Sequence, residues 1–380
     1  MPIVRSDSGD QRLLEAAQAH GIVISVSFWA ADALTMMYAT ITCVDLAERF
    51  GPCSVLVRGY AGMALVLGVV PLHSLARAYG AKAVALGEAI GDADSLAFAR
   101  FLCGLYLSGA GRLDEAAAQL KLAFEDYERL GDGRRFEDAS NVYSSVLYYQ
   151  GHWSMATTVA EEGHQSAKRR GDPQSIVAPL ILTAIMLARR GDHEGALRAF
   201  LRIPLAPGDH VSRIDVQGEI ALLYVQLGRF EDARVAAEEV AGLLSGRRPA
   251  TVGVLVGTLA FAEACRELWV RAVKLGLPEA PSLQRAAWSA VGSLAVLAKV
   301  FPLAEAGAQL KRGAFELVRG RLRRARFEFT RALENARGMG MVIHILEAHE
   351  RLCAVTDGAE QEEHARKAAS LRKQVLAGPG

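Results

Sequence analysis

The stretch "GRLDEA" at residues 111–116 begins with a glycine and ends with an alanine five residues later. The same spacing returns in "GHWSMA" from Gly151, "GDHEGA" from Gly191, "GRFEDA" from Gly228 and "GRLRRA" from Gly320. Glycine readily adopts the left-handed backbone conformation that ends a helix, so each copy is typical of a turn between two helices. The chain is therefore predicted to repeat a helix–turn–helix unit.

Small residues recur at fixed distances from these glycines, each of which we number as position 15 of a repeat unit. Position 8 holds Gly104, Ser144, Ala184, Ala221 and Gly313; position 20 holds Ala116, Ala156, Ala196, Ala233 and Ala325; position 27 holds Ala123, Gly163, Ile203, Val240 and Ala332. A large side chain would force two antiparallel helices apart where they cross, so this pattern indicates closely packed helix pairs. A further unit is predicted around Pro71, with Ala64, Ala76 and Ala83 at the same positions.

The pattern resembles the tetratricopeptide repeat, which has small residues at positions 8, 20 and 27 and a glycine in the turn. The turns at Pro71, Gly111, Gly151, Gly191 and Gly228 are 40, 40, 40 and 37 residues apart, whereas the usual period is about 34. The usual proline at position 32 and the signature tryptophan are missing. The resemblance implies an all-α fold, a right-handed superhelical solenoid of antiparallel helix pairs.

Four segments narrow the resemblance. They are "LARAYGAKAVALGEAIGD" (75–92), "GDGRRFEDASNVYSSVLYYQGHW" (131–153), "SAKRRGDPQ" (166–174) and "AKVFPLAEAGAQLKRGAFELVRGR" (298–321). They are similar to the helical array that lies C-terminal to the ATPase module of bacterial STAND-type ATPases, often beside a class III adenylate/guanylate cyclase or a protein kinase domain. The likeness spans about residues 28–345. The sequence has no GxxxxGK[ST] phosphate loop and no cyclase or kinase motif, so those activities are not implied for it.

The turn signals also predict the organisation of the chain. We expect a flexible N-terminus over 1–10, a single solenoid over 11–372 and a disordered tail over 373–380. Within the solenoid, regular repeats are predicted over about 55–245, an irregular section over 246–301, a final repeat over about 303–338 and capping helices to 372. The irregular section has helical periodicity without the glycine–alanine signature. Two long helices are expected there, joined by "GLPEAPS" at 276–282.

Composition excludes several classes of protein. The 380 residues carry a net charge of +1, which argues against a polyanion-binding protein. The most apolar stretch, 21–44, contains Asp32 near its middle. A carboxylate there costs about 2.5–3.5 kcal/mol, so no membrane insertion is expected. The five cysteines form no CxxC pair, which indicates reduced thiols and a cytoplasmic location.

No motif for catalysis or metal binding is apparent. His344 and His349 are five residues apart, a spacing that does not place both on one helix face as HExxH would. No GxSxG nucleophile motif is present. Carboxylates such as Asp92 and Asp94 lie at predicted helix starts, where they favour the helix dipole. We therefore expect no catalytic residue, no cofactor and no metal site, and predict that the protein is not an enzyme.

Segment 307–337 is locally basic, with nine Lys or Arg residues against three Glu. The segment has no nucleic-acid recognition motif. It is therefore interpreted as a solvated face, or as a patch that docks an acidic partner such as "DGAEQEE" at 357–363. No nucleic-acid partner is expected.

A candidate binding groove follows from the resemblance, because positions 2, 5, 9, 12 and 13 of first helices face the concave side of tetratricopeptide arrays. These positions hold Asp138, Asn141, Ser145, Tyr148 and Tyr149 in one repeat, and Phe98, Phe101, Arg189, Asp215 and Gln226 in neighbouring repeats. The set combines aromatic surface with charges of both signs, which suits an extended or helical peptide. We expect groove side chains to be only partly buried. The alternative is that Tyr148 and Tyr149 belong to the core.

Two functional hypotheses result. The first is a non-enzymatic scaffold that binds a protein or peptide. By resemblance it would be the sensor or regulatory arm of a bacterial signalling ATPase, cyclase or kinase, in cis or in trans. The second is a receptor that closes its superhelix around a small molecule or a peptide pheromone. A deep pocket lined with mixed polar groups would favour the second.

Overall fold

The structure is a computed structural model that describes residues 8–29, 32–246 and 251–377. Over these residues the chain consists of helices and connecting turns, without a strand. The predicted all-α class is therefore confirmed. The chain divides into two compact units, Met1–Ala139 and Ser140–Gly380, and the division falls within helix α7. That one solenoid spans 11–372 stays a prediction.

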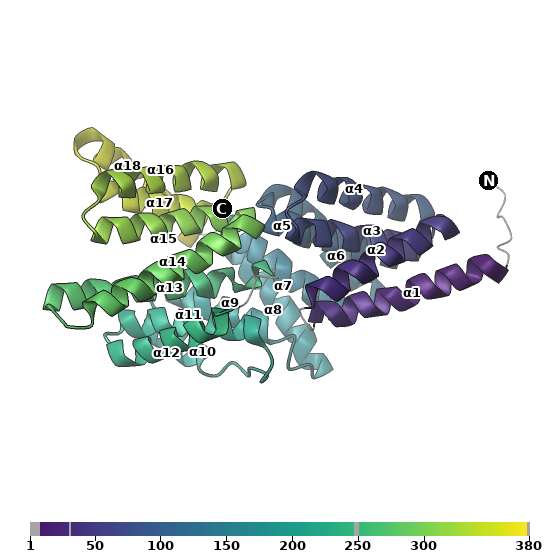
Figure 1. The fold of residues 1–380 in the computed structure, drawn as a ribbon, viewed down its shortest axis with the longest axis horizontal. Helices are drawn as coiled ribbons and strands as arrows, with labels where there is room; N and C mark the ends of the chain where they lie inside the picture. Colours follow the sequence, from purple (N-terminus) through teal and green to yellow (C-terminus); the bar gives the residue numbers. More distant parts are fainter. Residues whose placement is uncertain (1–7, 30–31, 247–250, 378–380) are drawn as a thin grey trace. The chain divides into compact units, whose positions relative to one another are not determined.

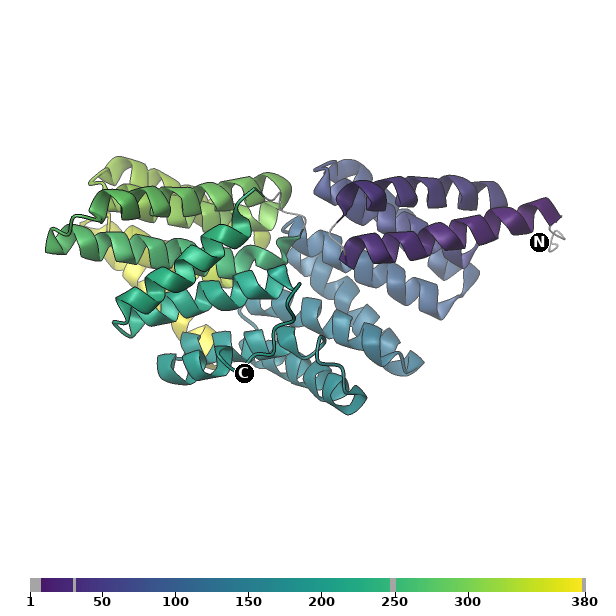
Figure 2. The ribbon, with the colours of Figure 1, turned by 60° about the horizontal axis from the view of Figure 1, so that its bottom comes forward.

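The helices can be followed from purple α1 to yellow α18 in Figure 1, and from a second direction in Figure 2. The first unit contains α1 (Ser8–Trp29), α2 (Ala33–Phe50), α3 (Ser54–Val69), α4 (His73–Ile90), α5 (Ala93–Gly109), α6 (Leu113–Leu130) and the start of α7 (Gly133–Tyr149). The second contains the rest of α7, α8 (Trp153–Arg170), α9 (Val177–Arg189), α10 (His193–Phe200), α11 (His210–Gln226), α12 (Phe230–Leu244), α13 (Leu255–Leu275), α14 (Ala280–Val300), α15 (Glu305–Val318), α16 (Leu322–Met339), α17 (Val342–Cys353) and α18 (Gly358–Ala377). Short 3-10 turns at Val252–Val254 and Pro302–Ala304 precede α13 and α15.

Consecutive helices pack as pairs, for example α3 with α4, α11 with α12 and α15 with α16. The odd-numbered, first helices of successive pairs also pack on each other, as α11 does on α13 and α13 on α15. Helix α7 packs on α8, where the hydroxyl of Ser140 donates to the carbonyl oxygen of Val159 at 2.6 Å. This is the arrangement of a helix-pair solenoid within each unit. It places side chains of the first helices side by side.

The predicted turn glycines occupy the turns. Gly111, Gly151, Gly191, Gly228 and Gly320 have φ angles of 72°, 80°, 88°, 74° and 72°. A side chain at such an angle is strained, so the left-handed conformation explains why glycine recurs at position 15.

The small residues at positions 8, 20 and 27 lie where the paired helices cross. The alanines at position 20 have no exposed surface. A Cβ atom added to Gly104 would lie 2.5 Å from the Leu120 side chain, and one added to Gly313 would lie 2.5 Å from Phe329. Such distances are shorter than van der Waals contact, so steric exclusion accounts for the pattern.

The irregular section contains one long helix pair, α13 and α14, with Gly276 at the turn at a φ of 63°. The helices α11 and α13 approach closely, because a Cβ atom on Gly218 would lie 2.1 Å from the carbonyl oxygen of Gly257. Two glycines therefore permit direct backbone contact between two first helices. This contact was not predicted, because the section lacks the repeat signature.

The predicted ends of the chain need correction. Helix α1 begins at Ser8 and α18 continues to Ala377, so the helical part is longer at both ends than the expected 11–372. At the C-terminal end, Val375 is buried and would lie 3.3 Å from a Cβ atom on Gly151, which shows that it packs against the α7–α8 turn. The rest of the predicted flexible ends, 1–7 and 378–380, lies outside the described residues.

The apolar stretch 21–44 is divided between two helices. Asp32 caps α2 by accepting the backbone N–H of Thr35 at 3.1 Å. Within the part of the chain that the structure describes, no helix is both long enough and apolar enough to cross a membrane.

Candidate functional site

Polar and aromatic side chains of six first helices converge in the second unit. We call this group the first-helix cluster. It consists of Tyr148 and Tyr149 on α7, Arg189 on α9, Asp215 and Glu219 on α11, Glu263, Arg266 and Glu267 on α13, Lys311 on α15, and His344, Glu347 and Arg351 on α17. The two halves of the cluster differ in how well their charges are paired.

The first half is built around two tyrosines. The Nε–H of Arg189, an exposed residue, donates to the hydroxyl oxygen of Tyr148 at 3.1 Å. The rings of Tyr148 and Tyr149 lie 5.5 Å apart in an edge-to-face arrangement, and Trp153 stacks on Tyr148 at 6.2 Å. Burial raises the pKa of both tyrosines, so both hydroxyls are neutral at physiological pH.

Helix α11 contributes two carboxylates one turn apart. Oδ1 of Asp215 accepts the backbone N–H of Gly257, in the first turn of α13, at 2.8 Å. Glu219 is 3% exposed, and among the described residues no hydrogen bond or ion pair reaches its carboxylate. Burial raises the pKa of Glu219 and raises that of Asp215 well above its ordinary value. Helix α11 therefore presents one carboxylate that accepts a single hydrogen bond, Asp215, and one that accepts none from the described residues, Glu219.

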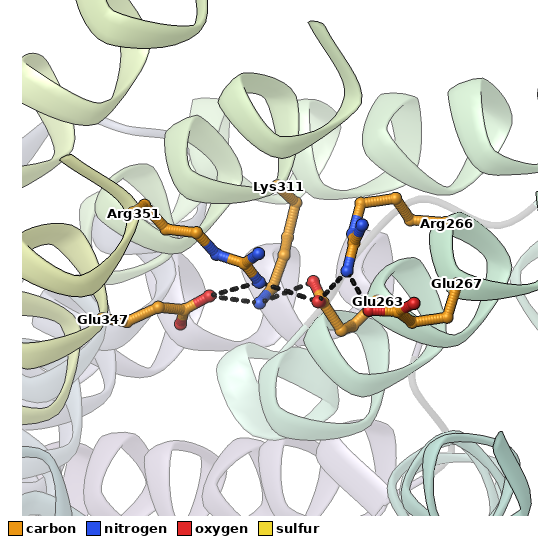
Figure 3. A network of polar contacts seen from close by, with 6 residues as sticks. All are labelled: Glu263, Arg266, Glu267, Lys311, Glu347 and Arg351. Carbon is orange, nitrogen blue, oxygen red and sulfur yellow. Dashed lines mark hydrogen bonds and ion pairs between the residues drawn. The ribbon is translucent and has the colours of Figure 1, made fainter. Parts of the chain in front are cut away.

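The second half is a dense ion-pair network, in which Figure 3 shows Lys311 pointing between Glu263 and Glu347. The Lys311 Nζ lies 3.2 Å from Glu263 Oε2 and 2.6 Å from Glu347 Oε1. Glu263 Oε1 accepts from Arg266 and from Arg351, each at 2.7 Å. The network joins α13, α15 and α17 through charges that are mostly withdrawn from solvent.

The charges of this network set its protonation states. Burial alone would raise the pKa of Glu347, but Lys311 and Arg351 outweigh it and lower that pKa to about 2. The same cations, with Arg266, hold the pKa of Glu263 well below its ordinary value. Burial lowers the pKa of His344 to about 4, so this imidazole is neutral beside Tyr149, whose ring centre is 6.0 Å away.

The predicted groove residues fall into two groups. Tyr148, Tyr149, Arg189 and Asp215 are brought together in the first-helix cluster. The other second-unit residues lie on the same helices: Ser145 is exposed one turn before Tyr148, the Asn141 Oδ1 atom is buried without a hydrogen bond, and Gln226 is exposed at the end of α11.

Phe98, Phe101 and Asp138 belong to the first unit. Two guanidinium groups lie near the ring of Phe98, that of Arg58 at 5.0 Å and that of Arg135 at 5.5 Å from the ring centre. Phe101 packs against a buried cluster that includes Tyr127 and Phe136. Asp138 forms an ion pair with Arg134, one turn away on the same helix, at 3.6 Å. These side chains have structural partners within their own unit.

One expectation about the tyrosines is wrong. Groove side chains were expected to be only partly buried, but Tyr148 is 4% and Tyr149 6% exposed. Their neighbours Trp153 and His344 cover much of the ring surface. The alternative, that the tyrosines pack in the core, describes their burial better, although the Tyr148 hydroxyl still bonds to an exposed arginine.

Sequence reasoning missed Glu219 as a site residue and did not connect Lys311 with the groove. Both residues lie nine positions before a turn glycine, Gly228 or Gly320, which makes them position 6 of their units. Position 6 shares a helix face with positions 2, 9 and 13, because the steps are four, three and four residues. A charge isolated within an apolar run, as in "GEIALLYV" from Gly218, was the available signal.

The basic segment 307–337 is partly neutralised by the chain itself. Arg326 forms a bidentate ion pair with Glu360 at 2.8 Å to each oxygen, so the acidic stretch 357–363 docks on it as anticipated. Beside it, a surface hollow of about 430 Å³ is lined by Trp288, Arg312, Glu316, Arg324, Phe327 and Glu328. Trp288 and Phe327 are 49% and 58% exposed.

No metal centre emerges from the parts of the chain that are described, where no group of three His, Cys, Asp or Glu side chains is arranged around a common point. The five cysteines are free thiols. Burial raises the pKa of Cys103 and Cys265 to about 12, so these thiols are unreactive at neutral pH.

Comparison with known proteins places the fold. No family model matches the chain, and no curated protein matches it in sequence. A Rap protein complexed with competence and sporulation factor is 11% identical over 97% of this chain and 100% of its own, with a TM-score of 0.65. NprR in complex with its cognate peptide NprX is 13% identical over 95% and 99%, with a TM-score of 0.59. The apo form of the quorum sensor NprR from B. thuringiensis is 14% identical over 94% and 99%, with a TM-score of 0.54.

At these identities the likeness concerns the fold. The chain has the fold of a helix-pair repeat protein, and the predicted all-α solenoid is confirmed.

Proposed function

We propose that this protein is a non-enzymatic peptide-binding receptor or scaffold, and that the first-helix cluster of the second unit forms its binding site. The observation that carries the proposal is the incomplete pairing of charges on adjacent first helices, next to the buried Tyr148–Tyr149 pair. Arg189 is an exposed residue, and the carboxylate of Glu219 lacks a partner among the described residues. A peptide supplies both hydrogen-bond donors and acceptors along its backbone, so it complements such a surface.

The comparisons support this proposal. Two proteins of the same fold are described as complexes, one with a cognate peptide and one with competence and sporulation factor, and they match nearly the whole length of the chain. The surface hollow beside Trp288 carries charged groups and exposed aromatic rings but belongs to the helices α14–α16. It is a second surface rather than an alternative for the cluster.

The proposal includes a regulatory role. The segments 75–92 and 298–321 resemble arrays attached to bacterial STAND-type ATPases, so we infer that peptide binding controls a signalling ATPase, cyclase or kinase domain, in cis or in trans. A pull-down from the source cell, with and without a selected peptide, tests this role. Peptide-dependent recovery of a nucleotide-hydrolysing or cyclase protein supports it, and recovery that ignores the peptide contradicts it.

Binding itself is tested by selecting random heptapeptides displayed on phage against the full chain. Ser145 and Ser154 provide a matched pair, because both are exposed serines, one on first helix α7 and one on second helix α8. Ser145→Trp places bulk over the first-helix face and is expected to weaken binding of selected peptides about tenfold or more, a loss of about 1.4 kcal/mol or more. Ser154→Trp is expected to leave it within about twofold. Equal effects, or no selected peptide, would contradict the proposed site.

A further inference from the structure

The carboxylates of the first-helix cluster are unequally paired with cations and hydrogen-bond donors. Glu263 is paired with three cations, Glu347 with Lys311 and Arg351, and Glu267 with Arg266. Asp215 accepts one backbone N–H. Glu219 differs from these carboxylates: no hydrogen bond or ion pair to it occurs within the described residues, although it is the most buried of the five.

Nearby cations do not replace a direct partner. Arg189 and Lys311 attract Glu219 electrostatically, but neither forms an ion pair with it. Lys311 is engaged by Glu263 and Glu347, and Arg189 donates to Tyr148. An ionised carboxylate removed from water without a partner is unfavourable, and proteins normally supply one. In the described residues of the chain alone, the Glu219 carboxylate therefore lacks a cationic partner in direct contact.

The surroundings of Glu219 suit a cation. Asp215 lies one turn earlier on the same face of α11, and its Oδ2 atom accepts no hydrogen bond from residues 8–29, 32–246 and 251–377. The hydroxyl groups of Tyr148 and Tyr149 interact electrostatically with Glu219. Carboxylates bind ammonium and guanidinium groups through ion pairing and charge-assisted hydrogen bonds.

We propose that Glu219 and Asp215 bind a cationic group of the peptide ligand. The group is an ammonium or guanidinium, supplied by a Lys or Arg side chain or by the peptide N-terminus. This inference rests on the proposed function and specifies the chemistry of its ligand. The other N–H groups of Arg189, whose Nε–H donates to Tyr148, can then donate to a peptide carbonyl or carboxylate oxygen at the edge of the site.

The test uses heptapeptides selected on the full chain, each made in three forms: unchanged, with Lys or Arg replaced by norleucine, and N-acetylated. Loss of the relevant charge is expected to weaken binding to the wild-type chain about tenfold or more. The form that loses affinity identifies the source of the cation. Glu219→Gln, which keeps the side-chain shape, is expected to reduce the difference in affinity between the charged and uncharged peptide forms to about twofold.

Three controls separate recognition from a structural role. Glu334→Gln removes an exposed charge from second helix α16 and is expected to preserve the discrimination. Glu219→Asp retains the charge and is expected to restore part of the discrimination between charged and uncharged peptides. Asp215→Asn replaces Glu219→Gln if the latter does not fold, as judged by circular dichroism.

The outcomes are distinct. Selected peptides without a cation, or equal discrimination by the wild-type and Glu219→Gln chains, would overturn the inference while leaving peptide binding intact. Failure of the wild-type chain to select any peptide would remove the proposed function, and this inference with it.

Discussion

Replacing Lys311 with methionine removes the cation that joins α13, α15 and α17 while keeping most of the side-chain volume. Lys311 is 9% exposed, and its Nζ lies 3.2 Å from Glu263 and 2.6 Å from Glu347. Removing one partner of a buried ion pair costs about 3–5 kcal/mol, because the remaining charge stays buried. We expect Lys311→Met to lower the free energy of unfolding by about that amount at pH 7.

The neighbouring Arg312 provides the control. Its side chain is 41% exposed and lies 3.9 Å from Glu328, so Arg312→Met is expected to cost less than about 1 kcal/mol. Urea unfolding followed by circular dichroism measures both losses, with the slope of the transition as a check that the two states are comparable.

The loss from Lys311→Met depends on pH. The pKa of Glu347 is lowered to about 2 in the folded wild-type chain, below its ordinary 4.5. Its stabilising contribution is therefore present above pH 4.5 and is lost as the pH falls toward 2. Without Lys311, the pKa values of Glu347 and Glu263 rise, so the difference in stability between wild type and variant narrows over that interval. Equal costs for Lys311→Met and Arg312→Met, or a difference that does not change with pH, would refute the reasoning.

Three other predictions follow from burial and charge. Glu219→Gln is expected to stabilise the peptide-free chain by about 1–3 kcal/mol at pH 7, because it removes an unpaired buried charge; a lower melting temperature would indicate that Glu219 has a structural role instead. Ala116→Leu and Ala156→Leu add bulk at crossings with no exposed surface and are each expected to cost about 1–3 kcal/mol, whereas melting like the parent would contradict the assigned repeat register. The purified chain is expected neither to hydrolyse ATP nor to make cyclic nucleotides, and activity that stays with the chain through stringent purification would disprove this.

The fold was predictable because its determinants are local and repeated. Leu120 and Phe329 leave no room for a side chain at positions 104 and 313, which are therefore glycines. Gly111 ends a helix at a positive φ. Each constraint acts within one helix pair, so it appears in the sequence at a constant spacing. The contact between Gly218 and Gly257 joins two different pairs and has no such spacing, which is why it could not be predicted.

The candidate site was predictable only in part. The repeat register located Tyr148, Arg189 and Asp215 on one face, and the structure brings them together. The register did not include position 6, where Glu219 lies, and it did not extend into the section that contains Glu263. The pairing of Lys311 with Glu263 and Glu347 depends on how three helices pack, which the spacing of residues within one repeat does not specify.

The most direct test of peptide binding at the first-helix cluster is a crystal structure of the full chain with a library-selected peptide. We predict that the peptide lies along the first helices of the second unit, with a cationic nitrogen about 3 Å from a carboxylate oxygen of Glu219 or Asp215. A peptide bound elsewhere, for example in the hollow lined by Trp288 and Phe327, with Glu219 still unpartnered, would contradict it.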